Sequence, residues 1–303
     1  MRERFLDYPM EVTIESQAVC NAACTFCPYP TIERKGQKLP DELLNKLVDE
    51  MISWDRLVYL SPFKLSDPLL DKRVLPLCER INAASEKIVL RLFTNGSALT
   101  PEKVARIAGL KRLNYLWISL NSHIPEEYER LMGLKFERTA RNLDYLHSID
   151  FPHSVMLSAV GYPNEEFRYY CYERWPKFES MAIKKDAWID FTEAQVTEVP
   201  DTGCSRWYEL SVMANGKVSH CCMDSGEDSR WTVGDVTKQT LYEVYNSPRW
   251  RDRREQLVSR KSLDPETSPC SGCTYGLLPW FLGVVSTLAT IGQLLFPGGP
   301  TAI

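Results

Sequence analysis

The stretch that decides the fold is Met10-Glu-Val-Thr-Ile-Glu-Ser-Gln-Ala-Val-Cys-Asn-Ala-Ala-Cys-Thr-Phe-Cys27. Apolar and polar side chains alternate from Met10 to Ser16, which predicts a strand that leads directly into a cysteine loop. The C-x3-C-x2-C spacing of Cys20, Cys24 and Cys27 can place three thiolates around one iron–sulfur cube. The fourth iron of that cube then has no cysteine. The spacing therefore indicates a cluster at which a substrate or cofactor can chelate, rather than a simple electron relay.

The composition is that of an ordinary folded protein and not of a nucleic-acid-binding one. The 303 residues are 44% hydrophobic and 25% charged, with a formal net charge of −4, so no polyanionic partner is expected. The first residues carry charges of both signs without an apolar run, and no secretory signal is expected. Ten cysteines in such a chain are typical of metal ligands in a reducing compartment, and we expect a cytoplasmic location.

Strand and helix patterns alternate about six times in the first two thirds of the chain. This alternation predicts an α/β fold with a parallel sheet and right-handed crossovers. A closed barrel needs eight units, so the count favours a partial (β/α)6 TIM-like barrel. Expected strands lie at residues 10–16, 57–60, 88–93, 115–120, 155–160 and 187–191. Expected helices lie at residues 40–51, 69–84, 101–109, 125–132, 136–147 and 165–175.

The pattern changes after about residue 200, where a smaller unit is expected. Strands at 207–213 and 217–222 flank Asn215-Gly216, a strong hairpin signal in which both central residues adopt positive φ. A helix at 240–258 follows, and then the pair Cys270-Ser-Gly-Cys273. The expected division is a barrel at 1–199, a second domain at 200–275 and a tail at 276–303.

The tail from Thr274 onward carries no charged residue, and its residues 277–296 are mostly apolar. Its length would permit a membrane span, but it contains Pro279 and several polar residues and lacks flanking Lys/Arg clusters. We expect a buried or lid-forming helix. A membrane- or lipid-facing segment and an oligomer contact are the alternatives.

The cysteine loop resembles that of the radical S-adenosylmethionine (SAM) superfamily, whose signature is this spacing with an aromatic residue, here Phe26, before the last cysteine. In that family, the open iron binds the amino and carboxylate groups of SAM. Reductive cleavage of SAM then yields methionine and a 5′-deoxyadenosyl radical that abstracts hydrogen from the substrate. The alternative is a structural or zinc site, although zinc sites usually show two C-x2-C pairs.

Further segments resemble the family's cofactor-binding strand ends. The run Lys64-Leu-Ser-Asp-Pro-Leu-Leu70 corresponds to the family's Gly-Gly-Glu-Pro stretch, with both glycines replaced and a carboxylate kept for the methionine ammonium. Thr94-Asn-Gly96 matches its Thr-Asn-Gly, and Ser119-Leu-Asn121 its Ser-Leu-Asp. A turn and a helix cap are the structural alternatives. The resemblance implies SAM contacts at Phe26, Ser66, Asp67, Asn95, Ser119 and Asn121.

A second cysteine set follows the pattern C-x11-G-x4-C and then C-x2-C, formed by Cys204, Gly216, Cys221, Cys270 and Cys273. It resembles the auxiliary-cluster extension of radical SAM enzymes called SPASM or, in its shorter form, twitch. No cysteine follows Cys273, so the resemblance implies one further [4Fe–4S] cluster held by four thiolates, with zinc as the alternative.

The remaining cysteines and the histidines are less specific. Cys222 follows a predicted ligand and is expected on the opposite face of its strand, where it either packs in the core or donates hydrogen to a substrate radical. Cys78 and Cys171 fall in helical segments and are expected in the core. The four histidines show no metal-binding spacing.

Together these features predict a radical SAM enzyme of a biosynthetic pathway that acts on a small molecule such as a sugar or amino sugar. Electron loss to the auxiliary cluster would make it a dehydrogenase, and hydrogen return from Cys222 would make it an epimerase. A peptide or lipid substrate is an alternative, and a non-catalytic iron–sulfur protein is an alternative of another class. The expected cofactors are two [4Fe–4S] clusters and SAM, with flavodoxin or ferredoxin as reductant.

Overall fold

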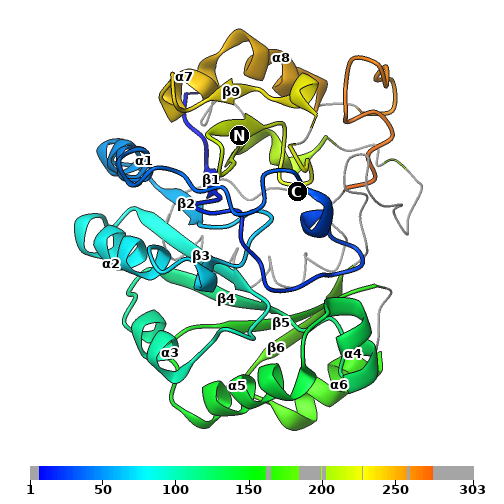
Figure 1. The fold of residues 1–303 in the computed structure, drawn as a ribbon. Helices are drawn as coiled ribbons and strands as arrows, with labels where there is room; N and C mark the ends of the chain where they lie inside the picture. The colour runs from blue at the N-terminus through cyan, green and yellow to red at the C-terminus, as the bar shows by residue number, and fades with distance from the viewer. Residues whose placement is uncertain are drawn as a thin grey trace, which may run out of the picture.

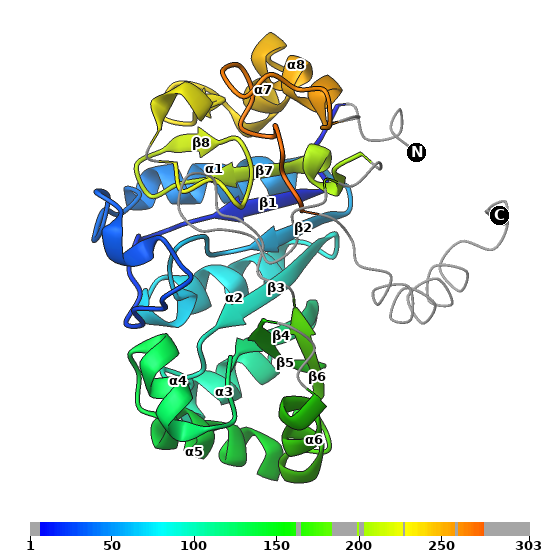
Figure 2. The same cartoon turned by 90° about the vertical axis from the view of Figure 1, so that its right-hand side faces the viewer.

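The computed structural model describes residues 7–161, 165–183, 199, 203–226, 228–257 and 260–275. Among these residues, the strands form one nine-stranded sheet in the order β6-β5-β4-β3-β2-β1-β7-β8-β9. The strands from β6 to β7 pair in parallel, whereas β8 and β9 pair antiparallel. The strands are β1 Glu11–Ile14, β2 Val58–Ser61, β3 Ile88–Thr94, β4 Leu113–Ser119, β5 Val155–Val160, β6 Glu179–Ile183, β7 Glu209–Val212, β8 Lys217–Ser219 and β9 Gly234–Asp235. Figure 2 shows them following one another from β7 to β6.

Helices cover the outer face of this sheet, and α1, α2 and α3 lie side by side (Figure 1). The helices are α1 Asp41–Ser53, α2 Val74–Ala84, α3 Pro101–Ala108, α4 Pro125–Met132, α5 Phe136–Ser148, α6 Glu165–Arg174, α7 Leu241–Asn246 and α8 Pro248–Gln256. The described parts of the chain also contain the short 3-10 helices η2 Tyr29–Thr31, η3 Pro68–Leu70, η4 Ser205–Tyr208 and η5 Ser229–Trp231. The strand–helix repeat confirms the predicted α/β partial barrel.

The two faces of the sheet differ in chemistry because side chains alternate along each strand. Leu90 and Leu92 of β3 are buried beneath the helices, while Arg91 and Phe93 lie on the inner face and are half-buried. The same alternation holds in the neighbouring strands. The inner face carries the polar and aromatic residues Glu11, Thr13, Tyr59, Ser61, Arg91, Phe93, Tyr115, Trp117, Ser119, Ser158, Glu209 and Ser211.

Two predicted helices differ from the structure, and the strand predicted at 187–191 lies outside the described residues. The structure has a sixth parallel strand, β6, at Glu179–Ile183. The helix predicted at 240–258 is instead α7 and α8, because Ser247 is extended before Pro248 (φ −61°, ψ 148°) and proline disfavours helical backbone in the preceding residue. The helix predicted at 69–84 likewise divides into η3 and α2, with Asp71 extended between them.

The hairpin around Gly216 is present, but the predicted turn type is wrong. Gly216 has φ +80°, whereas Asn215 is not among the residues with positive φ. The Gly216 amide donates to the Met213 carbonyl (2.9 Å), and the Met213 amide donates to the Lys217 carbonyl (2.8 Å). This is a three-residue loop whose left-handed glycine forms a bulge. The strand that returns also ends at Ser219, so Cys221 and Cys222 follow β8 rather than lying within it.

The packing of two helical cysteines agrees with the expectation, since Cys78 in α2 and Cys171 in α6 are buried in the main core. None of the helices in the described parts of the chain combines the length and the apolar character that a bilayer crossing requires. The tail at 276–303 lies outside those parts, and its expected roles stay predictions. The cytoplasmic location also stays a prediction.

Substitution of Gly216 tests the hairpin geometry. The backbone of Gly216 has φ +80°, and a Cβ added there would lie 2.7 Å from Thr237 Cγ2. Gly36 has a similar φ of +76°, but a Cβ added there would meet nothing within 4 Å. We expect Gly36→Ala to lower the free energy of unfolding by about 1 kcal/mol through backbone strain alone. Gly216→Ala should cost about 1–3 kcal/mol more through crowding. Urea unfolding measures both, and equal losses would contradict the crowding at Gly216.

Candidate active site and two cysteine sets

The carboxyl edge of the parallel strands, where such folds place their active sites, gathers the cysteine loop and the loops after β2, β3 and β4. The cysteine loop is held from two sides. The Ala23 amide donates to the Met132 carbonyl at the end of α4 (2.8 Å), and the Asp67 amide donates to the Val19 carbonyl (2.8 Å). The loop position is therefore determined by backbone hydrogen bonds to neighbouring segments.

The thiols of Cys20, Cys24 and Cys27 are half-buried and close enough for their charges to act on one another. Burial raises the pKa of Cys20 to about 12 and that of Cys27 to about 11. Burial also raises the pKa of Cys24, and the charges of the other two thiols raise it further. Bound iron would offset the cost of deprotonating these buried thiols, because a metal-bound thiol is deprotonated. The three side chains thus form a closely coupled donor set.

Asp67 connects the loop after β2 to the end of β3. Its carboxylate accepts hydrogen bonds from the Leu69 amide (3.0 Å), the Thr94 hydroxyl (2.8 Å) and the Asn95 amide (2.9 Å). The side chain is buried, and burial raises its pKa. The structure therefore assigns Asp67 a positioning role, and its predicted contact with the SAM ammonium stays a prediction.

Asn95 brings the end of β3 close to the first cysteine set. Its Nδ2 is 3.9 Å from Cys20 Sγ and 2.9 Å from Asn21 Oδ1. Its Oδ1 accepts from the Ser97 amide and hydroxyl, and Asn21 Nδ2 donates to the same Ser97 hydroxyl (2.8 Å). This network orients the Asn95 side chain toward Cys20.

Asn121 approaches the same loop through Met132. Its backbone has φ 62°, and its Nδ2 lies 2.8 Å from Met132 Sδ, which is itself 3.4 Å from Cys24 Sγ. Its Oδ1 accepts from the Val160 amide (3.1 Å), which joins the ends of β4 and β5. The other predicted SAM contacts, Phe26, Ser66 and Ser119, are half-buried at this same edge, and their roles stay predictions.

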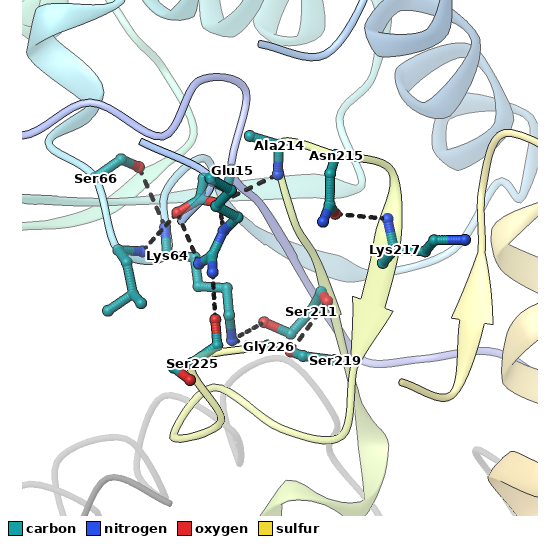
Figure 3. Close-up of polar contacts among 12 residues, drawn as sticks. Glu15, Lys64, Ser66, Ser211, Ala214, Asn215, Lys217, Ser219, Ser225 and Gly226 are labelled. Atoms are coloured by element: carbon teal, nitrogen blue, oxygen red, sulfur yellow. Dashed lines mark hydrogen bonds and ion pairs between the residues drawn. The ribbon is translucent and has the colours of Figure 1, made fainter. Parts of the chain in front are cut away.

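Glu15 is a residue that the sequence reasoning missed. Its carboxylate is completely buried directly after β1 and pairs with the guanidinium of Arg34 (2.8 Å). It also accepts from the amides of Leu65 (3.0 Å) and Ala214 (3.1 Å), as Figure 3 shows. Arg34 in turn donates to the Ser225 carbonyl. One carboxylate thus joins the cysteine loop, the loop after β2 and the hairpin.

Lys64 makes a second link across the same region. Its ammonium is buried and donates to the hydroxyls of Ser219 (2.9 Å) and Ser211 (3.2 Å), two residues that Figure 3 shows beside it. It also donates to the Cys221 carbonyl (3.0 Å). Lysine is rarely buried without such partners. The loop that carries Asp67 is therefore attached to the segment that carries Cys221.

The second cysteine set comes together at the opposite edge of the sheet. The charges of Cys204, Cys270 and Cys273 act on one another, and that of Cys270 acts on Cys221. Burial raises the pKa of Cys270 to about 12 and raises those of Cys204 and Cys221. The set combines residues 204, 221, 270 and 273 from separate segments, as the spacing predicts for a cluster site.

Strand direction explains why the two sets lie at opposite edges. Cys20 follows the carboxyl end of β1, whereas Cys204 precedes the amino end of β7, which pairs with β1 in parallel. Cys221 returns to that same amino edge because β8 runs antiparallel to β7. The four residues of β1, at about 3.3 Å each, span roughly 13 Å between the edges.

A charged group lies on the inner face between the sets. Glu209 is buried on β7. Its carboxylate pairs with the Arg206 guanidinium (3.3 Å) and accepts a hydrogen bond from the Thr13 hydroxyl (3.4 Å). The Cys222 thiol is close enough to Glu209 for the charges of the two groups to act on each other. Burial raises the pKa of Glu209, which the charge of Arg206 partly offsets. Burial and the Glu209 charge together raise the pKa of Cys222 to about 12.

A model of the radical SAM superfamily matches residues 14–169, about half of the chain. The chain belongs to the radical SAM superfamily. A model of the SPASM iron–sulfur cluster-binding domain matches residues 204–274 of this radical SAM enzyme. The two matches contain the first cysteine set and the second one, respectively.

Solved structures of the same fold cover most of the enzyme. A structure of BtrN with AdoMet and 2-DOIA aligns with a TM-score of 0.56 at 13% identity, over 88% of this chain and 93% of that one. Streptococcus suis SuiB bound to precursor peptide SuiA has a TM-score of 0.65 at 14% identity, over 94% and 74%. Native anSMEcpe with AdoMet has a TM-score of 0.64 at 13% identity, over 88% and 89%. At these identities the likeness establishes the fold alone.

Mycofactocin maturase MftC of Mycobacterium tuberculosis is 28% identical over 161 residues. The match covers 52% of this chain and 39% of the maturase, so the chain spans about two fifths of that relative's length.

The donor sets fit the clusters that the family carries. Within the described residues, no three His, Cys, Asp or Glu side chains converge as a single bound ion would require. The thiols of each set nevertheless interact, and cubane ligands bind separate irons. Cys20, Cys24 and Cys27 would hold the cluster that binds SAM, and the second set would hold an auxiliary cluster. When bound, the first cluster supplies the electron that cleaves SAM.

The Glu15–Arg34 pair provides a stability test. Glu15→Gln leaves the Arg34 guanidinium buried without its carboxylate, and we expect the free energy of unfolding to fall by about 3–5 kcal/mol. Asp49→Asn removes an ion pair with Arg80 whose acid is 63% exposed, and this should cost less than about 1 kcal/mol. Urea unfolding of both variants gives the comparison. A loss in Glu15→Gln as small as that in Asp49→Asn would show that the pair does not constrain the fold.

Proposed function

We propose that this radical SAM enzyme dehydrogenates a small polar molecule, such as a sugar or amino sugar, at a carbon that bears a hydroxyl or amino group. The substrate would lose a hydrogen atom to the 5′-deoxyadenosyl radical, then one electron to the auxiliary cluster and one proton to a protein base. The observation that supports this proposal is the buried Glu209 carboxylate on the inner face between the two cysteine sets.

The inner face is suited to a small polar ring. Aromatic side chains cover the sheet from the loop after β2 to β4: the rings of Phe63 and Phe93 are 4.5 Å apart, and those of Phe93 and Trp117 5.6 Å. Charged groups lie beyond them, including Arg91, which pairs with Glu11 (3.0 Å). Ligand sites typically combine such apolar walls with a few placed polar groups.

A specific observation favours a second function, radical epimerisation. Cys222 lies beside Glu209 and Arg206, on the side of the sheet where a substrate radical would form. A thiol in this place could return a hydrogen atom to that radical. Modification of a peptide is a further candidate, which the similarity to SuiB, solved with its precursor peptide SuiA, and to the maturase MftC supports. A lipid substrate rests only on the apolar tail.

The cofactor proposal predicts about eight irons per chain for two [4Fe–4S] clusters after anaerobic reconstitution. With dithionite and SAM, the protein should form 5′-deoxyadenosine even without substrate. Cys20→Ala should abolish this product, whereas Cys78→Ala, at a buried core cysteine, should leave iron and product unchanged. Cys204→Ala should lower the iron to about four per chain.

Iron near four in the unsubstituted protein would remove the auxiliary cluster. Intact clusters without 5′-deoxyadenosine would instead favour a non-catalytic iron–sulfur protein.

The two reaction outcomes are separated by variants assayed in D2O with a panel of sugars and amino sugars. Dehydrogenation predicts a product that lacks two hydrogens, which Glu209→Gln should reduce at least tenfold and Cys222→Ala should leave unchanged. Both variants should still form 5′-deoxyadenosine. Mass spectrometry provides the readout. A product that gains solvent deuterium and disappears in Cys222→Ala would instead establish the epimerase.

A further inference from the structure

Three of the four auxiliary cysteines have a nitrogen donor aimed at their sulfur. His220 Nε2 lies 2.9 Å from Cys270 Sγ. Arg260 Nη1 lies 3.7 Å from Cys273 Sγ and is held there by hydrogen bonds to the carbonyls of Cys273 (3.2 Å) and Tyr275. The third donor is the Arg206 backbone amide, 3.4 Å from Cys204 Sγ. The donors come from three different segments, so their convergence is a property of the folded site.

His220 is held firmly in this position. It is buried, its amide donates to Asp224 Oδ2 (3.0 Å), and its ring packs edge-on against Trp250 at 6.1 Å. Within the described residues, its Nδ1 has no hydrogen-bond partner. Since burial disfavours a charged ring, the imidazole has one N–H, and the contact with Cys270 is the one that can use it.

Arginines add positive charge to the same site. Arg260 is buried and its charge acts on Cys204 and Cys270, and that of Arg253 acts on Cys270. Asp224 near Cys221 is an opposing charge. At the first cysteine set the charges of Asp67 and of Glu15, which is paired with Arg34, act on Cys20 and Cys27 respectively, and both raise the thiol pKa.

We infer that His220 and Arg260 are positioning residues that raise the reduction potential of the auxiliary cluster through N–H···S contacts with Cys270 and Cys273. This inference rests on the auxiliary cluster proposed above. The reduced state of a cluster carries one more negative charge than the oxidised state, so donors and cations near its sulfurs favour reduction. A site with these neighbours is suited to accept an electron from a substrate radical, which is the step that distinguishes dehydrogenation from epimerisation.

The test is a redox titration of the auxiliary cluster, followed by electron paramagnetic resonance. It uses the 303-residue chain with Cys20→Ala, Cys24→Ala and Cys27→Ala, in which only the second set can hold a cluster. His220→Leu removes the donor and should shift the midpoint potential to more negative values. His220→Gln keeps an N–H and should restore most of the shift. Arg260→Met, with Arg260→Lys as its charge-preserving control, tests the second donor independently of how well the His220 variants fold.

The possible outcomes distinguish a failure of this inference from a failure of the proposed function. If the background protein holds no iron, the auxiliary cluster itself is absent and the proposed function fails with it. If the background holds about four irons and neither His220→Leu nor Arg260→Met moves the potential, only this inference is overturned. Loss of iron in His220→Leu with retention in His220→Gln would also overturn it, because His220 would then support cluster binding rather than potential.

Discussion

A buried carboxylate, that of Glu15, is the constraint on which the rest of the site depends. An ionised group removed from water must be paired and hydrogen-bonded, or the folded state loses several kcal/mol. The partners of Glu15 come from the cysteine loop, the loop after β2 and the hairpin (Figure 3). A pair of this kind is weak evidence for high stability. It does select the one arrangement in which those three segments meet.

The sheet shows the same principle on a larger scale. Parallel sheets are usually apolar on both faces, but here the inner face carries paired charges such as Glu11–Arg91 and Arg206–Glu209. Each charge has a partner on a neighbouring strand or loop, so the face stays polar without leaving a charge isolated. The result is a polar surface between the two thiol sets.

The sequence predicts the parts of this structure that depend on local patterns. Helices α1 to α5 follow from amphipathic periodicity and the two cysteine sets from spacing, whereas α6 follows from its place in the strand–helix alternation. Pro248 carried a signal for the break between α7 and α8. Strand β6, with the run Glu179-Ser-Met-Ala-Ile183, lacks regular alternation and is formed by its pairing with β5. The roles of Lys64, Glu209 and His220 depend on partners more than 50 residues away or in other segments, which local patterns do not encode. The alternation Glu11, Thr13, Glu15 opposite Val12 and Ile14 was the available sign that the strand has a polar buried face.

The parallel pairing of β1 with β7 makes the short strand β1 a spacer between the first and the second cysteine set. Its length changes only in whole residues, and one inserted residue would add about 3.3 Å while turning the residues on one side of the insertion to the other face of the sheet. The distance between the two cysteine sets therefore cannot change by small amounts as the sequence of β1 diverges. Relatives that keep this strand would have to adapt to substrates of different size through the side chains on the inner face.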